Sequence, residues 1–154
     1  MDLSHSLRQV CGHEAELVAR YPSAHREGGP WLIASYRDVA APLVQIAGWH
    51  DVGKTTVGAW LVQKLVADGL VVGVLKHTHH AHADASAGTD TARYLAAGAV
   101  AATLVDEPLR SLDDVERVAR RLPPCDAVVL EGGKDLQLAR WWIGPRSDVA
   151  ASRR

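Results

Sequence analysis

The stretch from Gly48 to Thr56, GWHDVGKTT, limits what this chain can fold into more than any other part of the sequence. Two glycines bracket four residues and a Lys-Thr pair follows, which is the spacing of a loop that cradles nucleotide phosphates. The apolar run 43–47 comes before the loop, and a segment with apolar residues at helical spacing comes after it. The sequence therefore predicts a strand, a phosphate-binding loop and a helix. The alternative is a glycine-rich turn that only caps a helix and binds nothing.

The residue types in this loop fit the chemistry of a bound polyphosphate. Glycine permits a tight turn in which backbone N–H groups face the phosphates, and the start of the next helix adds partial positive charge. We expect Lys54 to neutralise the terminal phosphates and the Thr55 hydroxyl to hold a magnesium ion. The predicted phosphate site consists of Gly48, Trp49, His50, Asp51, Val52, Gly53, Lys54, Thr55 and Thr56.

Composition narrows the class of protein. The chain has 154 residues, of which 47% are hydrophobic, so it suits one globular domain with a proper core. With 17 basic and 18 acidic residues the net charge is -1, and no basic field indicates nucleic acid as a partner. The sequence has neither a signal peptide nor an apolar run of membrane-spanning length, and its two cysteines lie far apart. We expect a soluble cytoplasmic protein that contacts no membrane.

Strand and helix patterns alternate from Pro42 onward. The expected strands are 43–47, 71–75, 100–105 and 127–130, and the expected helices are 54–68, 91–97 and 111–122. This rhythm predicts an α/β fold in which a parallel sheet is covered by helices on both faces, giving three layers. Ligands of such a sheet bind at the carboxyl ends of its strands. Residues 42–154 are therefore the predicted P-loop nucleotide-binding domain.

Residues 1–41 carry no motif. Apolar residues in 1–20 recur at weakly helical spacing, and 21–30 (YPSAHREGGP) has the composition of a turn and linker. The apolar run 31–33 has no role that the pattern indicates. We interpret 1–41 as an N-terminal leader of unknown role, packed on the domain or partly mobile.

Two carboxylates flank the fourth expected strand. Asp126 and Glu131 are five residues apart, which separates them by about 16 Å at ~3.3 Å per residue. Only Glu131 lies at the carboxyl edge, where the phosphate loop lies, so Asp126 is expected to be a solvated charge. We predict that Glu131 contacts magnesium together with Thr55 or orients a water molecule, unless it is a plain loop carboxylate. Lys54 and Glu131 are thus the candidate catalytic residues.

A histidine-rich segment, KHTHHAH, ends the second expected strand at residues 76–82. Four of the eight histidines fall within its last six residues. Such a cluster can bind a borderline divalent metal, or it can donate hydrogen bonds to phosphates or to an anionic ligand. A polar loop without a ligand is the remaining interpretation. Lys76 would end a buried strand with a charge, so we expect it to face an anion.

Four segments of the chain form one pattern: the phosphate loop with its paired threonines, KHTHH at 76–80, GTDT at 88–91 leading to AGA at 97–99, and DAVVLEGGK at 126–134. Together they resemble the molybdopterin-guanine dinucleotide biosynthesis protein B family. The similarity covers about residues 43–143, and KHTHH is much more specific than the loop alone. The resemblance implies a P-loop NTPase fold that is shortened here at its C-terminal end. It also implies GTP binding with slow hydrolysis and, usually, a homodimer.

The resemblance further implies a role in molybdenum cofactor biosynthesis. A family member would act as an adapter to the guanylyltransferase that joins GMP to molybdopterin, with molybdopterin as a candidate bound ligand. By matching position, Asp90 and Glu131 would complete the nucleotide site. The edge that faces the cofactor would consist of Lys76, His77, Thr78, His79 and His80. The chain contains no Asn and hence no Asn-Lys-x-Asp guanine motif, so the preference for guanine is implied by the resemblance alone.

Two alternatives remain open. A nickel-insertion GTPase of the hydrogenase or urease maturation type would also pair a phosphate loop with histidines, but no cysteine pair lies near the loop. A non-catalytic remnant would keep the sheet and bind nucleotide weakly. No residue in the sequence is a convincing general base, so in every case the protein is at most a weak GTPase.

Overall fold

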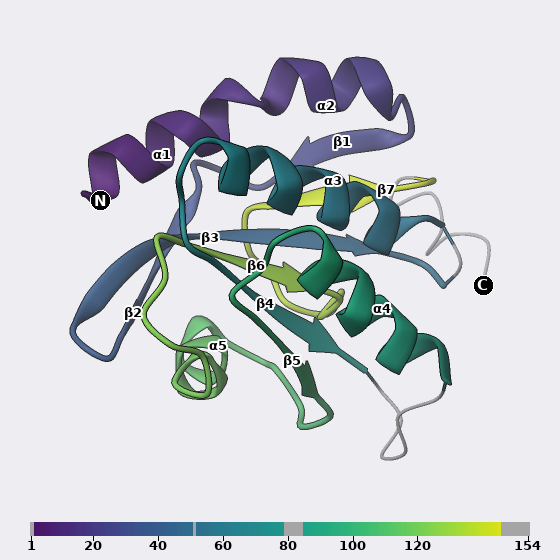
Figure 1. Ribbon diagram of the computed structural model, residues 1–154. Coiled ribbons are helices and arrows are strands. Elements are labelled where there is room, and N and C mark those ends of the chain that lie inside the picture. The colour runs from purple at the N-terminus through teal and green to yellow at the C-terminus, as the bar shows by residue number, and fades with distance from the viewer. Residues whose placement is uncertain (1, 51, 79–84, 146–154) are drawn as a thin grey trace.

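The computed structural model describes residues 2–50, 52–78 and 85–145, and within these ranges one mixed sheet of seven strands forms the centre of the molecule (Figure 1). The strands are β1 (Ala24–Glu27), β2 (Leu32–Tyr36), β3 (Val39–Gly48), β4 (Val72–His77), β5 (Ala101–Val105), β6 (Ala127–Glu131) and β7 (Arg140–Ile143). The helices are α1 (Leu3–Gly12), α2 (Glu14–Arg20), α3 (Lys54–Ala67), α4 (Ala85–Ala96) and α5 (Leu112–Ala119). No helix in these ranges is both long and apolar enough to cross a membrane.

The sheet has the order β1-β7-β3-β6-β4-β5, and β2 pairs with β3 outside this path. The five strands from β7 to β5 are parallel to one another, whereas β1 and β2 run antiparallel to their neighbours. Parallel strands joined by helices require helices on the faces of the sheet. The predicted α/β fold is thus confirmed, and the sheet, which was predicted to be parallel, is mostly so but carries two antiparallel strands.

Two hydrophobic clusters lie on opposite faces of this sheet. Because successive side chains of a strand point to opposite faces, Val129 of β6 joins one cluster and its neighbours Val128 and Leu130 join the other. The first cluster also contains buried residues of α1, α2, α3 and α4, and the second contains those of α5. Helices therefore cover both faces, and α5 stands apart from α3 and α4 (Figure 1).

The N-terminal segment is part of the sheet and its core. The interpretation of 21–30 as a turn and linker was wrong at Ala24–Glu27, because these residues form β1 and pair with β7. The last two residues of the unassigned run 31–33 are the start of β2, which forms a hairpin with β3. Val10 and Leu17, from α1 and α2, are 2% and 1% exposed in the first cluster. Residues 2–38 consequently cover one face of the sheet and pair with β7 and with the first half of β3.

Helix α4 and strand β7 differ most from the expected elements. The helix begins at Ala85, six residues before the expected start at Thr91, so Asp90 lies within it. Strand β7 was not predicted, because its four residues, RWWI, are too few to show a period. Both differences bear on the site: α4 carries side chains toward the phosphate loop, and β7 pairs with β3 up to Gly48.

Candidate functional site

The loop between β3 and α3 has the conformation that its glycines were expected to permit. Gly53 has φ of +95°, in the left-handed region that favours glycine, and it is followed by the first residue of α3. A Cβ on Gly48 would lie 2.5 Å from the carbonyl oxygen of Ile143 in β7. The Nζ of Lys54 donates to the carbonyl oxygens of Gly48 and Trp49 at 3.1 and 3.0 Å. The lysine ammonium thus lies back over the loop that precedes it.

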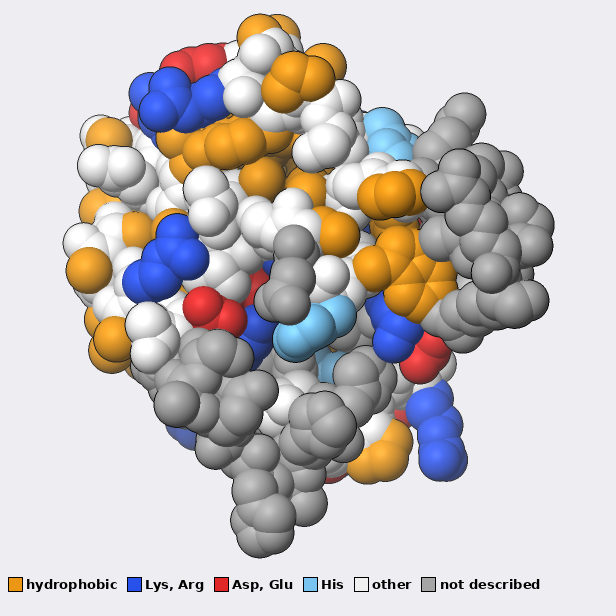
Figure 2. Space-filling model, turned by 90° about the vertical axis from the view of Figure 1, so that its right-hand side faces the viewer, with side chains coloured by type: hydrophobic (Ala, Val, Ile, Leu, Met, Phe, Trp, Pro, Cys, Tyr) orange, Lys and Arg blue, Asp and Glu red, His pale blue; other side chains and the backbone are white. Residues whose placement is uncertain are grey.

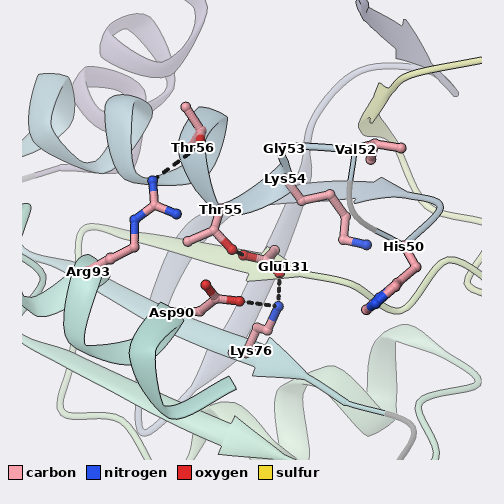
Figure 3. Close-up of a pocket in the computed structure, with 10 residues that line it drawn as sticks. All are labelled: His50, Val52, Gly53, Lys54, Thr55, Thr56, Lys76, Asp90, Arg93 and Glu131. Atoms are coloured by element: carbon pink, nitrogen blue, oxygen red, sulfur yellow. Dashed lines mark hydrogen bonds and ion pairs between the residues drawn. The ribbon is translucent and has the colours of Figure 1, made fainter. Parts of the chain in front are cut away.

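A cavity of about 200 Å³ opens beside this loop, at the carboxyl ends of β3, β4 and β6 (Figure 3). Its lining residues are His50, Val52, Gly53, Lys54, Thr55, Thr56, Lys76, Asp90, Arg93 and Glu131. Figure 2 views the molecule from the side at which the parallel strands end, and charged side chains of both signs gather with histidine near the centre of that face. The cavity therefore lies where a parallel sheet binds its ligands.

Glu131 is the centre of the polar contacts in the cavity. Its side chain is 0% exposed, and its Oε1 accepts hydrogen bonds from the Thr55 hydroxyl at 2.5 Å and the Tyr94 hydroxyl at 2.7 Å. The Lys76 ammonium pairs with Oε2 of Glu131, and its Nζ is also 3.1 Å from Oδ2 of Asp90. Figure 3 shows the Thr55 and Lys76 side chains directed at this carboxylate and the Asp90 side chain directed at Lys76. A buried charge needs such partners, because leaving it unpaired costs several kcal/mol.

The electrostatics fix the protonation of two of these partners. Burial by itself disfavours the Lys76 ammonium, but the Glu131 carboxylate and then Asp90 outweigh it and raise the pKa of Lys76. Burial, reinforced by the charge of Glu131, raises the pKa of Tyr94 well above its ordinary value. Lys76 is therefore a cation and Tyr94 a neutral hydrogen-bond donor at neutral pH.

The donor set fits a magnesium ion and a polyphosphate. The Thr55 hydroxyl and the carboxylates of Glu131 and Asp90 are hard oxygen donors, which magnesium prefers. No three His, Cys, Asp or Glu side chains within the described ranges are grouped to hold a metal. Magnesium would then take its other ligands from phosphate and water, as it does in nucleotide sites. Lys54 and the N-terminus of α3 supply the positive charge that phosphates require.

Most of the predicted phosphate loop lines this cavity, but Gly48 and Trp49 do not. Both precede the cavity, and the Trp49 ring packs edge-on against Trp142 of β7 with centroids 5.8 Å apart. The neighbouring strand therefore supports the start of the loop. Asp51, His79 and His80 lie outside the residues that the structure describes.

The structure separates Lys76 from the two residues that follow it. His77 and Thr78 line a second cavity of about 270 Å³ on the other side of the β4 end, next to Asp106 and Arg110. The separation of Lys76 from His77 follows from the alternation of side chains along a strand. The part of the predicted edge that the structure describes, residues 76–78, is thus divided between two cavities. The nickel alternative gains no support within the described ranges, since most of its histidine cluster lies outside them.

Two residues of the site were missed by the sequence analysis. Arg93 lines the cavity and donates from Nη2 to the Thr56 hydroxyl at 3.1 Å, and Tyr94 contacts Glu131. They follow Asp90 by three and four residues, which places all three on one face of α4. A helix prediction that began before Asp90 would have revealed this spacing.

Comparisons with known proteins identify a family whose profile matches the part of the chain that carries the site. The profile of the family described as "Molybdopterin guanine dinucleotide synthesis protein B" matches residues 43–144, which include the loop, Lys76, Asp90 and Glu131. A molybdopterin-guanine dinucleotide biosynthesis adapter protein of Escherichia coli (strain K12) is 30% identical over 110 residues. That similarity covers 64% of this chain and 63% of the relative, so the chain spans less than two thirds of the relative's length. No solved structure matches the chain.

Proposed function

The chain belongs to the molybdopterin guanine dinucleotide synthesis protein B family, and on this premise we propose that it binds GTP with Mg²⁺ as an adapter in molybdenum cofactor biosynthesis. Its partner would be the guanylyltransferase that joins GMP to molybdopterin, and molybdopterin is a candidate bound ligand. The relative from Escherichia coli is named an adapter protein, which supports this role. The family resemblance is likewise the basis for proposing a homodimer in the cytoplasm.

The observation that carries the proposal is the contact between Thr55 and Glu131 in the cavity beside the phosphate loop. The Thr55 hydroxyl already donates to the acid at 2.5 Å, so both oxygen donors lie on one side of the cavity. These two residues would hold magnesium, with Asp90 nearby. The metal, when bound, supplies charge neutralisation for the phosphates.

Lys54 is proposed to bind the terminal phosphates. Its ammonium now donates to two neutral carbonyl oxygens of its own loop, at Gly48 and Trp49. Phosphate oxygens are stronger acceptors for an ammonium because charge-assisted hydrogen bonds are roughly twice as strong as neutral ones. Nucleotide binding would therefore draw Lys54 from the loop toward the ligand. Arg93, from the opposite side of the cavity, adds a second cation near the phosphates.

Hydrolysis by this site is proposed to be slow. Glu131 is fully buried and accepts from Thr55, Tyr94 and Lys76, so its oxygens are engaged by protein donors. A general base must instead lie within hydrogen-bond reach of an attacking water. Glu131 would therefore act by holding the metal, and Lys54 by neutralising the charge of the phosphates. Neither role supplies a base that activates water, which suits an adapter better than a fast GTPase.

Calorimetric titration of the whole protein with GTP, GDP and ATP in millimolar magnesium tests the proposal. We expect GTP to bind and ATP to bind more weakly. Equal affinity for GTP and ATP would contradict the guanine preference and leave the phosphate site standing. Absence of binding by all three nucleotides would contradict the site itself.

A further inference from the structure

Tyr94 contacts the candidate metal site from the protein interior. It belongs to α4, is 0% exposed, and is not among the residues that line the cavity. Its hydroxyl donates at 2.7 Å to Oε1 of Glu131, the same oxygen that accepts the Thr55 hydroxyl. The tyrosine therefore contacts the acid from the protein interior, where a ligand in the cavity does not reach.

Gly58 makes room for this contact. A Cβ at position 58 of α3 would lie 2.2 Å from Oη of Tyr94 and 3.0 Å from two of its ring carbons. Gly58 lies one helical turn after Lys54, so the ring of Tyr94 crosses α3 at the turn that starts from the phosphate loop. Glycine weakens a helix interior by roughly 1 kcal/mol relative to Ala, so its presence here fits a requirement for space.

The donors to Glu131 come from three different elements. Thr55 is in α3, Tyr94 in α4 and Lys76 in β4, and together they occupy both carboxylate oxygens. A carboxylate held in this way has one orientation, whereas loss of the Tyr94 hydroxyl would leave Oε1 held by Thr55 alone. Thr55 is also the residue proposed to contact magnesium, so any movement of the acid would be transmitted to the metal.

We propose that Tyr94 is a positioning residue for magnesium: its hydroxyl fixes the Glu131 carboxylate in the orientation in which Glu131 and Thr55 hold the ion together. The inference rests on the proposed function, since it requires a nucleotide with magnesium at the phosphate loop. Residues that orient a metal ligand typically change metal affinity by 10- to 100-fold when they are substituted.

The test is the magnesium dependence of nucleotide binding in Tyr94→Phe, which removes only the hydroxyl. Magnesium is titrated into each protein in the presence of a saturating fluorescent GTP analogue, and affinity for the analogue is measured separately in EDTA. We expect magnesium affinity to fall about 10- to 100-fold, with less than about threefold change in EDTA. Tyr36→Phe is the matched control, because Tyr36 is also buried, at 3% exposed, but lies in the second hydrophobic cluster. It should leave both affinities unchanged.

Gly58→Ala provides a second variant that keeps the hydroxyl but displaces it. We expect the same loss of magnesium affinity, and a smaller effect of Gly58→Ala once Tyr94→Phe has removed the atom at 2.2 Å. Wild-type magnesium affinity in Tyr94→Phe would overturn the inference and leave the proposed function intact. Equal losses of affinity for the GTP analogue with magnesium and in EDTA would show a merely structural role of Tyr94 and would also overturn the inference. A wild-type protein that binds no nucleotide would refute the proposed function and the inference together.

Discussion

Lys76 and Glu131 are direct neighbours in the parallel pairing of β4 with β6, and their side chains form an ion pair at the carboxyl ends of these strands. The Glu131 side chain is 0% exposed and that of Lys76 is 13% exposed. The same position of β6 pairs with Ile46 of β3, two residues before the phosphate loop begins. The ion pair thus lies where three strands bring the loop, the acid and the second lysine together.

Lys54→Ala should remove most of the nucleotide affinity without unfolding the protein. Charge-assisted hydrogen bonds contribute about 1.5–3 kcal/mol each, so we expect at least a tenfold loss of affinity by calorimetry. Stability should change little, because the Lys54 ammonium donates to neutral carbonyl oxygens of its own loop, at Gly48 and Trp49. Lys64→Ala in the same helix is the control, since Lys64 makes a surface ion pair with Glu16. Retained wild-type affinity in Lys54→Ala would contradict the assignment.

Lys76→Met should destabilise the fold. It removes the cation from a buried carboxylate, and breaking a buried ion pair by removing one partner costs about 3–5 kcal/mol. At about 2–4 °C per kcal/mol for a chain of this size, the melting temperature should fall by roughly 6–20 °C. Thermal unfolding by circular dichroism measures this difference. An unchanged melting temperature would mean that the ion pair does not hold Glu131.

The stability contributed by Lys76 should be lost at high pH. Its pKa is raised above the ordinary value of 10.5, so the folded state holds the proton more tightly than the unfolded chain does. The contribution is complete below pH 10.5 and declines as the pH rises through the folded pKa. Burial also raises the pKa values of Tyr94 and Tyr36, so the folding stability that depends on these neutral tyrosines is lost as the pH rises through the same range. The difference in urea unfolding free energy between wild type and Lys76→Met cancels the contribution of Tyr36, which lies in the second hydrophobic cluster, and we expect this difference to shrink above pH 10.5.

Gly48→Ala should distort the phosphate loop. The new Cβ would lie 2.5 Å from the Ile143 carbonyl oxygen, and a backbone atom in a central strand cannot move aside. Overpacking of this kind costs about 1–3 kcal/mol, and nucleotide affinity should fall with it. Gly12→Ala is the control, because a Cβ there meets nothing within 4 Å. If Gly48→Ala and Gly12→Ala have the same free energy of unfolding, the close contact between the loop and β7 is contradicted.

The two cysteines should differ in reactivity toward iodoacetamide at pH 8. Cys11 is exposed, whereas Cys125 is 6% exposed and lies in the second hydrophobic cluster. Burial raises the pKa of both thiols, and Cys125 additionally lies out of reach of the reagent. Mass spectrometry should show one modified thiol in the folded protein and two in urea. In Cys11→Ser the folded protein should remain unmodified; rapid modification there would place Cys125 at the surface.

Local patterns predicted the centre of the fold. The spacing of Gly48, Gly53 and Lys54 and the apolar run before it determine a strand, a loop and a helix within 20 residues of one another. The position of Glu131 at the carboxyl end of a buried strand was likewise evident from the pattern around it, because strand direction alone assigns it to the edge of the loop. Such features depend on neighbours in the sequence.

Features without a local signal were missed. The hairpin between β2 and β3 turns at Arg37 and Asp38, with φ of +49° and +62°, where Asn-Gly or Asp-Gly would normally indicate the turn. The Arg37 Nε donates at 2.6 Å to the Arg120 carbonyl oxygen at the end of α5, a contact 83 residues away in the chain. Distant partners of this kind stabilise a backbone that the local sequence does not favour.

The sequence by itself determined the loop between β3 and α3, the parallel part of the sheet and the acid at its edge, since each follows from periodicity and spacing over a few residues. Only the tertiary structure decided what that acid contacts. The register of β4 against β6 places Lys76 beside Glu131, strand alternation turns His77 to another cavity, and the packing of α4 against Gly58 brings Tyr94 to the carboxylate. These contacts join residues far apart in the chain, and strand pairing and helix packing, which act across space, fix them.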